Sequence, residues 1–485
     1  MVRLFPILHV LSAVIAIFGL TMLLPLGLAH ALEDGAASAY DEAILLTFGA
    51  GAVLWVMTRE HKGELQTRDG FLLVSLVWTV LPAFATMPLL FAIPGLSFTD
   101  AYFETVSGLT TSGATVLTGL DHLPPSLNLW RTQLVWMGGM GVVVLAVAVL
   151  PLLGVGGAQV FRAETPGPMK DQKLTPRIAQ TAKGLWLVYG IITVACIGAF
   201  KWAGMTWLDA VMHGFSTMGL GGFSSHDDSF AWFKSATIDY VTVVFMLVAG
   251  INFGTHFLFL RNRSLGVYRR DPEALPYLAV TLGSSVFIAL FLLDQAVYED
   301  FGTALRYALF NVVSIATTTG FASTDYALWP IFAPVWMLFL SSFATCSGST
   351  GGGIKMIRAE LQLKQAWREL RRIVHPRAFI PVKLGGQLVE NNIIFAVLAF
   401  MLMYGATLIV ATMLLAFTGL DIVSAFSAVI ACINNMGPGL GKVGPSSNYQ
   451  GLTDFQTWVC TATMLLGRLE LFTLLVVFTP SFWRQ

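Results

Sequence analysis

Four short segments of this chain resemble one another, and each lies in a dip between two long hydrophobic stretches. Each ends in a glycine, and the four glycines follow one another at intervals of 109, 98 and 117 residues. The segments are Ser107-Gly-Leu-Thr-Thr-Ser-Gly113, Ser216-Thr-Met-Gly-Leu-Gly-Gly222, Ser314-Ile-Ala-Thr-Thr-Thr-Gly320 and Ala431-Cys-Ile-Asn-Asn-Met-Gly437. Similar segments at such intervals indicate an internal repeat, in which every copy folds in the same way.

The copies stay in register upstream of the glycines. The residue thirteen positions before each glycine is followed by alanine in all four copies, and these residues are Asp100, Asp209, Tyr307 and Ser424. In the first copy, the carboxylate of Asp100 is well placed to accept from free backbone N–H groups and to cap a short helix over 101–110. Such a helix is too short to cross a bilayer. The extended backbone after it is tolerated at membrane depth only where it is buried in protein or lines water.

The composition is that of a membrane protein. Hydrophobic residues make up 55% of the chain and charged residues 12%, whereas about 25% of an ordinary soluble domain is charged. A membrane-spanning helix needs about 20 apolar residues, and continuous apolar runs favour helices over the alternating strands of a β-barrel. Ten spans are predicted, near residues 5–30, 43–58, 71–94, 129–153, 184–203, 236–260, 276–293, 329–345, 393–419 and 456–479.

Basic residues concentrate in alternate loops between these spans. Of the 28 Lys and Arg residues, 22 lie near the two ends of the chain or within 59–68, 162–183, 261–270 and 355–383. Because cytoplasmic loops of membrane proteins are rich in Lys and Arg, these loops and both termini are predicted to be cytoplasmic. All four glycine segments then lie on the opposite side, and the repeats are parallel rather than inverted.

These observations predict an all-α polytopic membrane protein. In each repeat a span, a half-helix, a glycine loop and a second span follow one another, and the four repeats surround a pseudo-four-fold pore, as in potassium channels. Two extra transmembrane helices within residues 1–70 precede the repeats. The repeats are expected at 71–160, 161–270, 271–383 and 384–485, and the third contains a broken last helix and a basic cytoplasmic helix.

Three further motifs carry a resemblance to a known family. They are Arg162-Ala-Glu-Thr-Pro-Gly-Pro, Gly348-Ser-Thr-Gly-Gly-Gly-Ile-Lys355 and Leu466-Gly-Arg-Leu-Glu470. Together with the glycine loops and the two extra helices, they resemble the TrkH/KtrB/HKT superfamily of potassium transporters, and its bacterial TrkH branch most closely, over nearly the whole length. The resemblance implies potassium uptake across the bacterial inner membrane, with K+ bound in a filter and no covalent cofactor.

The resemblance also implies which residues form the selectivity filter. In HKT members a serine at the first filter glycine accompanies sodium selectivity, so Gly113 favours potassium. The fourth loop departs from the pattern, because Asn434-Asn435-Met436 replaces a hydroxyl-rich triplet. The expected filter residues are Thr110, Thr111, Ser112, Gly113, Leu220, Gly221, Gly222, Thr318, Thr319, Gly320, Asn435, Met436 and Gly437. K+ is expected to bind at Thr111, Ser112, Leu220, Gly221, Thr318, Thr319, Asn435 and Met436.

A charged residue stands inside the last predicted span. A charge at the centre of a bilayer costs about 2.5–3.5 kcal/mol on insertion scales, so Arg468 is expected to face protein or water. We interpret it as a barrier to cations below the filter, which is how the family uses an arginine in this motif. A buried salt bridge to a neighbouring helix is the alternative interpretation.

Four glycines interrupt the last span of the third repeat: Gly348, Gly351, Gly352 and Gly353. Glycine costs about 1 kcal/mol per position in a helix relative to alanine, so the helix is expected to unwind here. We interpret the segment as a flexible gate beneath the filter, matching the loop found there in the family, and a kink that does not gate is the alternative.

Partners and rival activities complete the sequence-based expectations. The resemblance implies a homodimer and a cytosolic nucleotide-binding regulatory subunit similar to TrkA, and no nucleic acid partner is expected. A secondary active symporter, coupling K+ to H+ or Na+, is the alternative, but the spans hold few ionisable residues and thereby favour a channel. No catalytic set of His, Cys, Asp and Glu converges in the spans, so an enzyme is not expected.

Overall fold

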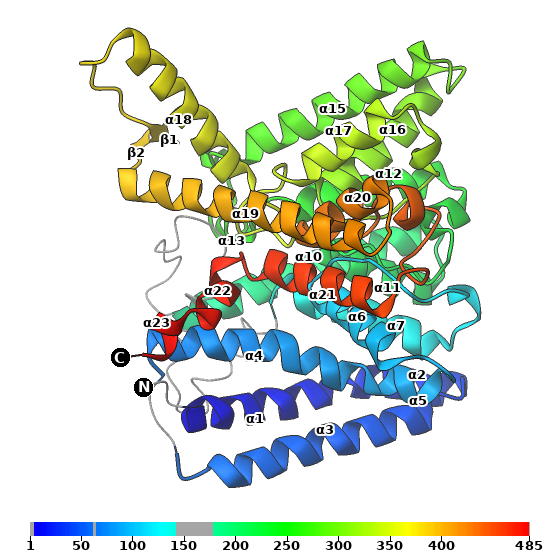
Figure 1. Cartoon of the computed structure of the whole chain (residues 1–485). Helices are drawn as coiled ribbons and strands as arrows, with labels where there is room; N and C mark the ends of the chain where they lie inside the picture. The colour runs from blue at the N-terminus through cyan, green and yellow to red at the C-terminus, as the bar shows by residue number, and fades with distance from the viewer. Residues whose placement is uncertain (1–3, 62–64, 142–177, 485) are drawn as a thin grey trace.

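The computed structural model describes residues 4–61, 65–141 and 178–484, and helices dominate this part of the chain (Figure 1). Its one sheet is a two-residue hairpin, in which β1 (Lys383–Leu384) pairs antiparallel with β2 (Gln387–Leu388). The Arg162-Ala-Glu-Thr-Pro-Gly-Pro motif and the second half of the predicted span 129–153 lie outside the described residues. Six helical segments of the described chain are long and apolar enough to cross a membrane, and two bent helix pairs raise this number to eight.

The N-terminal helices form one side of the molecule. α1 (Leu4–Thr21) leads into α2 (Leu23–Leu32), and α3 (Ala37–Thr58) returns along α1. α4 (Thr67–Ala85) follows and packs on α1, and α5 (Met87–Ala92) continues it. Three helical spans, at Leu4–Leu32, Ala37–Thr58 and Arg68–Ala92, therefore precede the first glycine segment.

A short helix leads into each glycine segment. These four helices are α6 (Phe98–Leu109), α11 (Trp207–Gly219), α16 (Phe301–Ala316) and α20 (Ile422–Ile433). A long apolar helix precedes each one along the chain: α4, α10 (Ile178–Trp202), α15 (Ala274–Asp294) and α19 (Asn391–Phe417). The helices that follow are α7 (Pro125–Gly139), α12 (Ala236–Ala249), α17 (Phe332–Ser341) and α21 (Asp454–Arg468).

The caps of the short helices correct one prediction. Asp100 is not the N-cap: the Ser97 hydroxyl caps α6, accepting from the Asp100 N–H over 3.0 Å, and the helix begins earlier than predicted. The carboxylate of Asp100 instead accepts from the Ser97 hydroxyl, inside the first turn, where a negative charge suits the helix dipole. The other three caps are Thr206, Asp300 and Asp421.

Two predicted continuous spans are bent in the structure. The span 236–260 consists of α12 and α13 (Phe253–Asn262), which meet at 92°. The span 456–479 consists of α21 and the segment Phe472–Phe478, which meet at 106°. Asn252 starts the new helix in the first case, since its side chain accepts from the Gly254 N–H. In the second, positive φ angles at Glu470 and Leu471 break the helical path.

The helices of successive copies interlock in a closed order. α7 packs on α11, α12 on α16, α17 on α20, and α21 returns to α6. Each helix that follows a glycine segment therefore supports the short helix of the next copy, and the fourth copy closes on the first.

One helix and the hairpin project away from this ring. α18 (Met356–Val374) and the β1–β2 hairpin lie at the upper left of Figure 1, and the two chain ends lie on the same left-hand side. The remaining short elements are α14 (Gly266–Arg270), α22 (Phe472–Leu475), α23 (Pro480–Trp483), η1 (Leu120–His122), η3 (Ser229–Phe233), η4 (Tyr326–Leu328), η5 (Gly441–Val443) and η6 (Val476–Phe478).

Candidate functional site

The four glycine segments meet in a closed ring. Each glycine is packed so closely on the backbone of the next segment that a Cβ atom would collide with it. A Cβ at Gly113 would lie 2.5 Å from the Gly221 carbonyl oxygen, and one at Gly437 would lie 2.7 Å from the Ser112 carbonyl oxygen; Gly222 faces the carbonyl of Thr319 in the same way, and Gly320 that of Met436. The structure thus brings together all four predicted segments, whose glycines follow one another at intervals of 98 to 117 residues in the sequence.

All four segments have the same backbone conformation. The residue two places before each glycine has a left-handed φ of 52–60°, and these residues are Thr111, Leu220, Thr318 and Asn435. The glycines themselves have φ between 56 and 94°. Left-handed residues other than glycine are uncommon, and for β-branched threonine they are outliers. Strain of this kind, of order 1–3 kcal/mol per residue, persists only where the surroundings enforce it, and such places cluster at functional sites.

Hydroxyl groups brace the first and third segments internally. The hydroxyls of Thr110 and Ser112 lie 2.8 Å apart, and those of Thr317 and Thr319 lie 2.7 Å apart. The fourth segment has no hydroxyl at these places, but the Asn435 side-chain amide donates to the Ser112 hydroxyl over 2.9 Å. In the fourth segment, a hydrogen bond to the first segment therefore takes the place of a hydroxyl pair within the segment.

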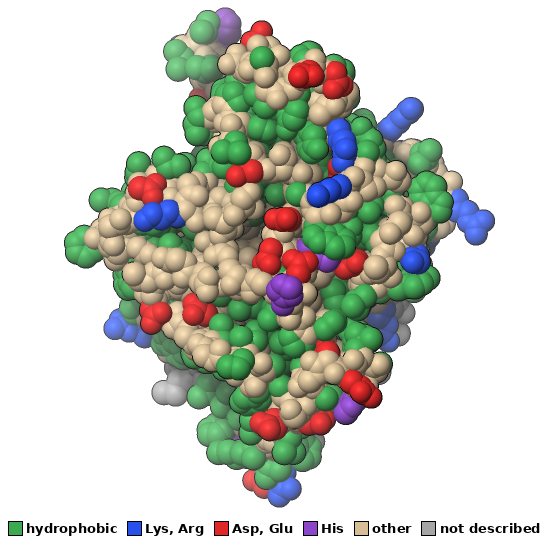
Figure 2. All heavy atoms as spheres, turned by 90° about the vertical axis from the view of Figure 1, so that its right-hand side faces the viewer, with side chains coloured by type: hydrophobic (Ala, Val, Ile, Leu, Met, Phe, Trp, Pro, Cys, Tyr) green, Lys and Arg blue, Asp and Glu red, His purple; other side chains and the backbone are tan. Residues whose placement is uncertain are grey.

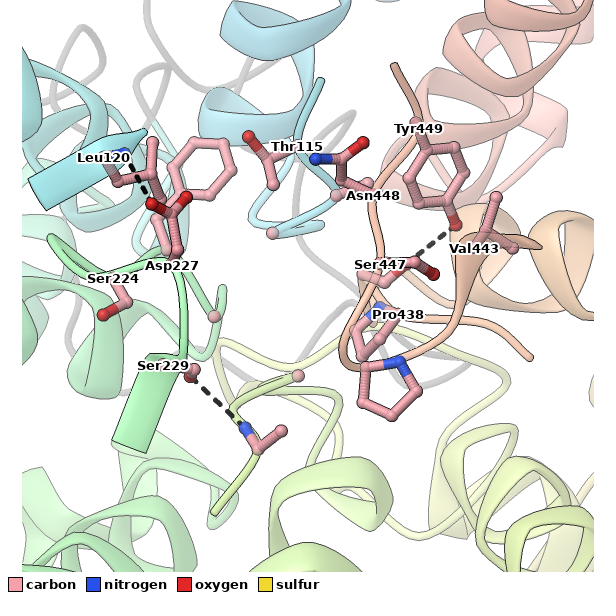
Figure 3. A pocket seen from close by; sticks show the side chains of 18 of the residues that line it. Thr115, Leu120, Ser224, Asp227, Ser229, Pro438, Val443, Ser447, Asn448 and Tyr449 are labelled. Carbon is pink, nitrogen blue, oxygen red and sulfur yellow. Dashed lines mark hydrogen bonds between the residues drawn. The ribbon is translucent and has the colours of Figure 1, made fainter. Parts of the chain in front are cut away.

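An open cavity lies on one side of the ring, with about 80 Å³ of space for the centres of water molecules. The four ring glycines contribute to its wall, as do Thr115, Asp227 and Asn448, which Figure 3 labels. Tyr449 also lines it and donates its hydroxyl to the Gly437 carbonyl over 2.8 Å. In Figure 2, acidic side chains and histidine gather near the middle of a hollowed face of the molecule.

A buried ion pair, which sequence reasoning missed, supports this wall. The Arg131 and Glu104 side chains are each 1% exposed and lie 2.8 Å apart. Arg131 also donates to the Ser224 carbonyl and lies over the Phe223 ring, both just after the second segment. Glu104 accepts from Thr115, just after the first segment. Arg131 belongs to α7. A basic residue within the predicted span 129–153 was the available signal.

His226 joins two elements beside the cavity. Its Nδ1 atom lies 2.5 Å from Asp121 of η1, and its Nε2 atom lies 3.3 Å from Asp209 of α11. Burial lowers the pKa of His226, but the hydrogen bonds and charges of Asp209 and Asp121 outweigh burial, so the pKa lies above its usual value. Within the described chain, no three His, Cys, Asp or Glu side chains gather as a metal site.

A loop over 345–355 presses against the other side of the ring. The Thr350 hydroxyl donates to the Met218 carbonyl over 2.9 Å, in the second segment. The Gly352 N–H donates to the Thr318 hydroxyl over 2.8 Å in the third segment. A Cβ at Gly352 would collide with the Asn434 carbonyl of the fourth segment. The loop is thus tightly seated, and its glycines permit the close approach.

The other glycines of this loop are also in tight places. A Cβ at Gly348 would lie 2.6 Å from the Asn252 side chain, and one at Gly351 would lie 2.9 Å from the Thr317 carbonyl. Gly353 has a φ of 78°, and a Cβ there would lie 2.7 Å from the Ser341 carbonyl. The chain is not α-helical across these glycines, since α17 ends at Ser341 and α18 begins at Met356.

Arg468 lies between this loop and the first segment. Its guanidinium donates to the Thr350 carbonyl over 3.0 Å, to the Thr111 hydroxyl over 3.3 Å and to the Gly138 carbonyl of α7. Glu470, two residues on, pairs with Arg358 of α18 over 2.7 Å. The loop and Arg468 together therefore contact all four segments.

The chain is similar in sequence to a family of known proteins. The profile of the family described as "TrkH: Cation transport protein" matches residues 38–485. The chain belongs to the TrkH family. It is 47% identical to the "Trk system potassium uptake protein TrkH" of Salmonella typhimurium over 98% of this chain and 99% of that protein. It is 36% identical to the "Trk system potassium uptake protein TrkG" of Escherichia coli over 98% of each chain.

A solved structure is similar over nearly the whole chain. The crystal structure of the potassium transporter TrkH from Vibrio parahaemolyticus matches with a TM-score of 0.89 and 44% identity, over 99% of this chain and all of the other. Membership of the TrkH family and the apolar helices together make this chain a multi-pass membrane protein.

Proposed function

We propose that this member of the TrkH family takes up potassium through a gated, channel-like pore. The observation that carries the proposal is the closed ring of four segments with one backbone conformation. Rings of backbone carbonyls can replace the hydration shell of a dehydrated cation. In this proposal the four copies are the four parallel repeats expected from the sequence, around a pseudo-four-fold axis.

The backbone conformation suits this role. Left-handed residues at Thr111 and Gly113 flank Ser112, and the same alternation occurs in the other three segments. Alternating handedness turns successive peptide carbonyls towards the same side of the chain, so that they line the axis together. We place K+ at the eight residues named above for binding, with the four glycines at the mouth of the filter. The names of the relatives, which specify potassium, support this choice of ion.

The loop 345–355 and Arg468 form the closed gate in this proposal. A guanidinium held between Thr350 and Thr111 puts a positive charge on the path just beyond the ring. Two unit charges about 5 Å apart repel by roughly 3 kcal/mol at an effective dielectric constant of 20. Cations therefore pass only when the loop and Arg468 move aside.

The setting of the pore is also a proposal. We place the chain in the bacterial inner membrane with both termini in the cytoplasm, because the basic loops mark that side. The cavity of Figure 3 then opens to the outside, where acidic side chains attract cations. A homodimer and a TrkA-like nucleotide-binding regulatory subunit complete the proposed assembly.

The test is current through the purified chain in a planar bilayer with opposed ion gradients. A reversal potential that follows the K+ gradient alone is expected, whereas dependence on a H+ or Na+ gradient would indicate the symporter instead. Gly113→Ser should lower the preference for K+ over Na+ and rescue a potassium-uptake-deficient bacterium poorly. Gly190→Ser is the matched control, because Gly190 has open space around its Cβ position. Equal ion preference in both variants would refute the filter assignment.

A further inference from the structure

The carboxylate of Glu273 is hydrogen-bonded at both ends of the loop 345–355. We call these two ends, residues 345–347 and 355–357, the neck of the loop. The Oε1 atom of Glu273 accepts from the N–H of Ser347 over 3.0 Å and from the N–H of Ile357 over 2.9 Å. These residues bracket the loop, one near its start and one in the first turn of α18. A backbone bond from the Met356 N–H to the Thr345 carbonyl, 2.8 Å long, closes the neck at the same level.

Glu273 reaches the neck from a different part of the chain. It is the N-cap residue of α15 and is only 3% exposed. The carboxylate of Asp271 fixes this position, because it accepts from the N–H groups of Glu273 and Ala274. Its other oxygen accepts from the Thr255 hydroxyl of α13. Hydrogen bonds therefore connect the neck to the start of α15. The start of α15 is in turn hydrogen-bonded, through Asp271, to α13 of the bent pair α12–α13.

The charged and titratable groups around Glu273 come from every neighbouring element. Asp271 is on its own segment, and Lys355 and Cys346 belong to the loop; all three interact electrostatically with Glu273. His256 of α13 bonds to the Tyr268 hydroxyl and the Val248 carbonyl. Arg358 of α18 is paired with Glu470. The two hydrogen bonds of Glu273 thus link α15 to the loop, where Ala274 and Tyr277 of the same helix also share a buried cluster with Cys346 and Met356.

The neck and the tip of the loop are mechanically connected. Only a few residues separate Ser347 from Thr350 and Gly352, whose bonds seat the tip under the ring. The buried Lys355 side chain donates a hydrogen bond to the Gly351 carbonyl and so connects the end of the loop to its tip. A neck that is held closed therefore holds the tip in place, while a loosened neck lets the tip withdraw.

We propose that Glu273 is a positioning residue of the gate, whose carboxylate clamps both ends of the loop 345–355 and keeps it seated under the ring. This inference rests on the proposed function, in which that loop closes the pore. Hydrogen bonds to an ionised carboxylate are stronger than those to a neutral group. Loss of the charge on Glu273, by substitution or by protonation, therefore loosens the neck and opens the gate.

The pKa of Glu273 lies in a range where a change of pH near neutrality changes the charge of its side chain. Burial raises the pKa of Glu273 to about 7, although the N–H bonds from Ser347 and Ile357 oppose the rise. The raised pKa places proton uptake near neutral pH. Because the protonated form clamps more weakly, acid on the side of the loop should increase opening, and alkali should reduce it.

The test is single-channel recording of the full-length chain with the pH varied on the side of the loop. Glu273→Gln should raise the open probability at about pH 8 roughly ten-fold and weaken its dependence on pH, because a neutral side chain clamps more weakly. Glu390→Gln is the matched control: Glu390 is also an N-cap residue of a long helix, but it is exposed. It should behave as the wild type, and so should His256→Gln.

A second measurement needs no variant. Protection of the backbone amides of 345–357 against hydrogen exchange, corrected for the intrinsic rate, should be lower at about pH 6 than at about pH 8. Equal protection, a wild-type pH profile in Glu273→Gln, or loss of that profile in His256→Gln would each overturn the role of Glu273. Absence of potassium current from the wild type would overturn the proposed function itself, so the two failures are distinguishable.

Discussion

The side-chain amide of Asn435, in the fourth ring segment, donates a hydrogen bond to the Ser112 hydroxyl in the first, over 2.9 Å. The same amide donates to the Met464 carbonyl of α21. One side chain thus ties the last segment to the first and to the helix behind it. The first and fourth segments are not consecutive along the chain. This hydrogen bond joins them directly and so helps to close the ring.

Replacement of Asn435 by alanine should therefore loosen the ring. Two buried hydrogen bonds are lost and the Ser112 hydroxyl loses a partner, which should cost roughly 1–3 kcal/mol of stability. The thermal midpoint of the purified chain should fall, and the preference for K+ over Na+ should weaken. Asn392→Ala, at an exposed position, is the control. An Asn435→Ala variant with unchanged midpoint and selectivity would show that the bond is dispensable.

The Arg131–Glu104 pair should be among the most sensitive positions of the molecule. Arg131→Met leaves the Glu104 carboxylate buried and without its cation, and breaking a buried pair in this way costs about 3–5 kcal/mol. The measurement is the thermal midpoint, with Arg372→Met as the control. Arg372 pairs with Glu369 at the surface, and such pairs contribute about 0–1 kcal/mol. Equal losses in the two variants would contradict the assignment of a supporting role to Arg131.

Removal of the Arg468 charge should increase potassium flux. Arg468→Ala takes away the guanidinium that bridges Thr350 and Thr111, and the repulsion estimated above predicts at least a roughly ten-fold rise in current. Arg468→Lys keeps the charge and should stay closer to the wild type. If the lysine and alanine variants conduct equally, then the shape of the side chain, and not its charge, forms the barrier.

The stability of the outer wall should depend on pH through His226. Its pKa is above the usual value in the folded chain, so protonation favours folding. The extra stability is fully present below the ordinary pKa of histidine and is lost as the pH rises through the higher folded pKa. The thermal midpoint of the wild type should therefore fall across this range, and that of His226→Gln should fall less. His61→Gln, at an exposed histidine, is the control and should keep the wild-type slope.

The sequence by itself determined the features that depend on local chemistry. Long apolar runs specify helices that cross a membrane, because backbone groups in lipid must be satisfied within the helix. The recurring glycine segments and their short preceding helices were visible as a repeat. The glycines at 348–353 marked the broken helix, because glycine is the residue that most weakens a helix apart from proline. The helix before the first segment, predicted over 101–110, is α6 (Phe98–Leu109) in the structure.

Only the tertiary structure decided the rest. It moved the helix cap from Asp100 to Ser97, bent two predicted spans, and brought Asn435 to Ser112, Arg131 to Glu104, and Glu273 to the neck of the loop. The last three of these are contacts between residues that are far apart in sequence. No local periodicity encodes such contacts, since they follow from how the four copies close on one another. The ring closes because all four copies pack against one another, so its closure depends on the whole chain and not on any one segment.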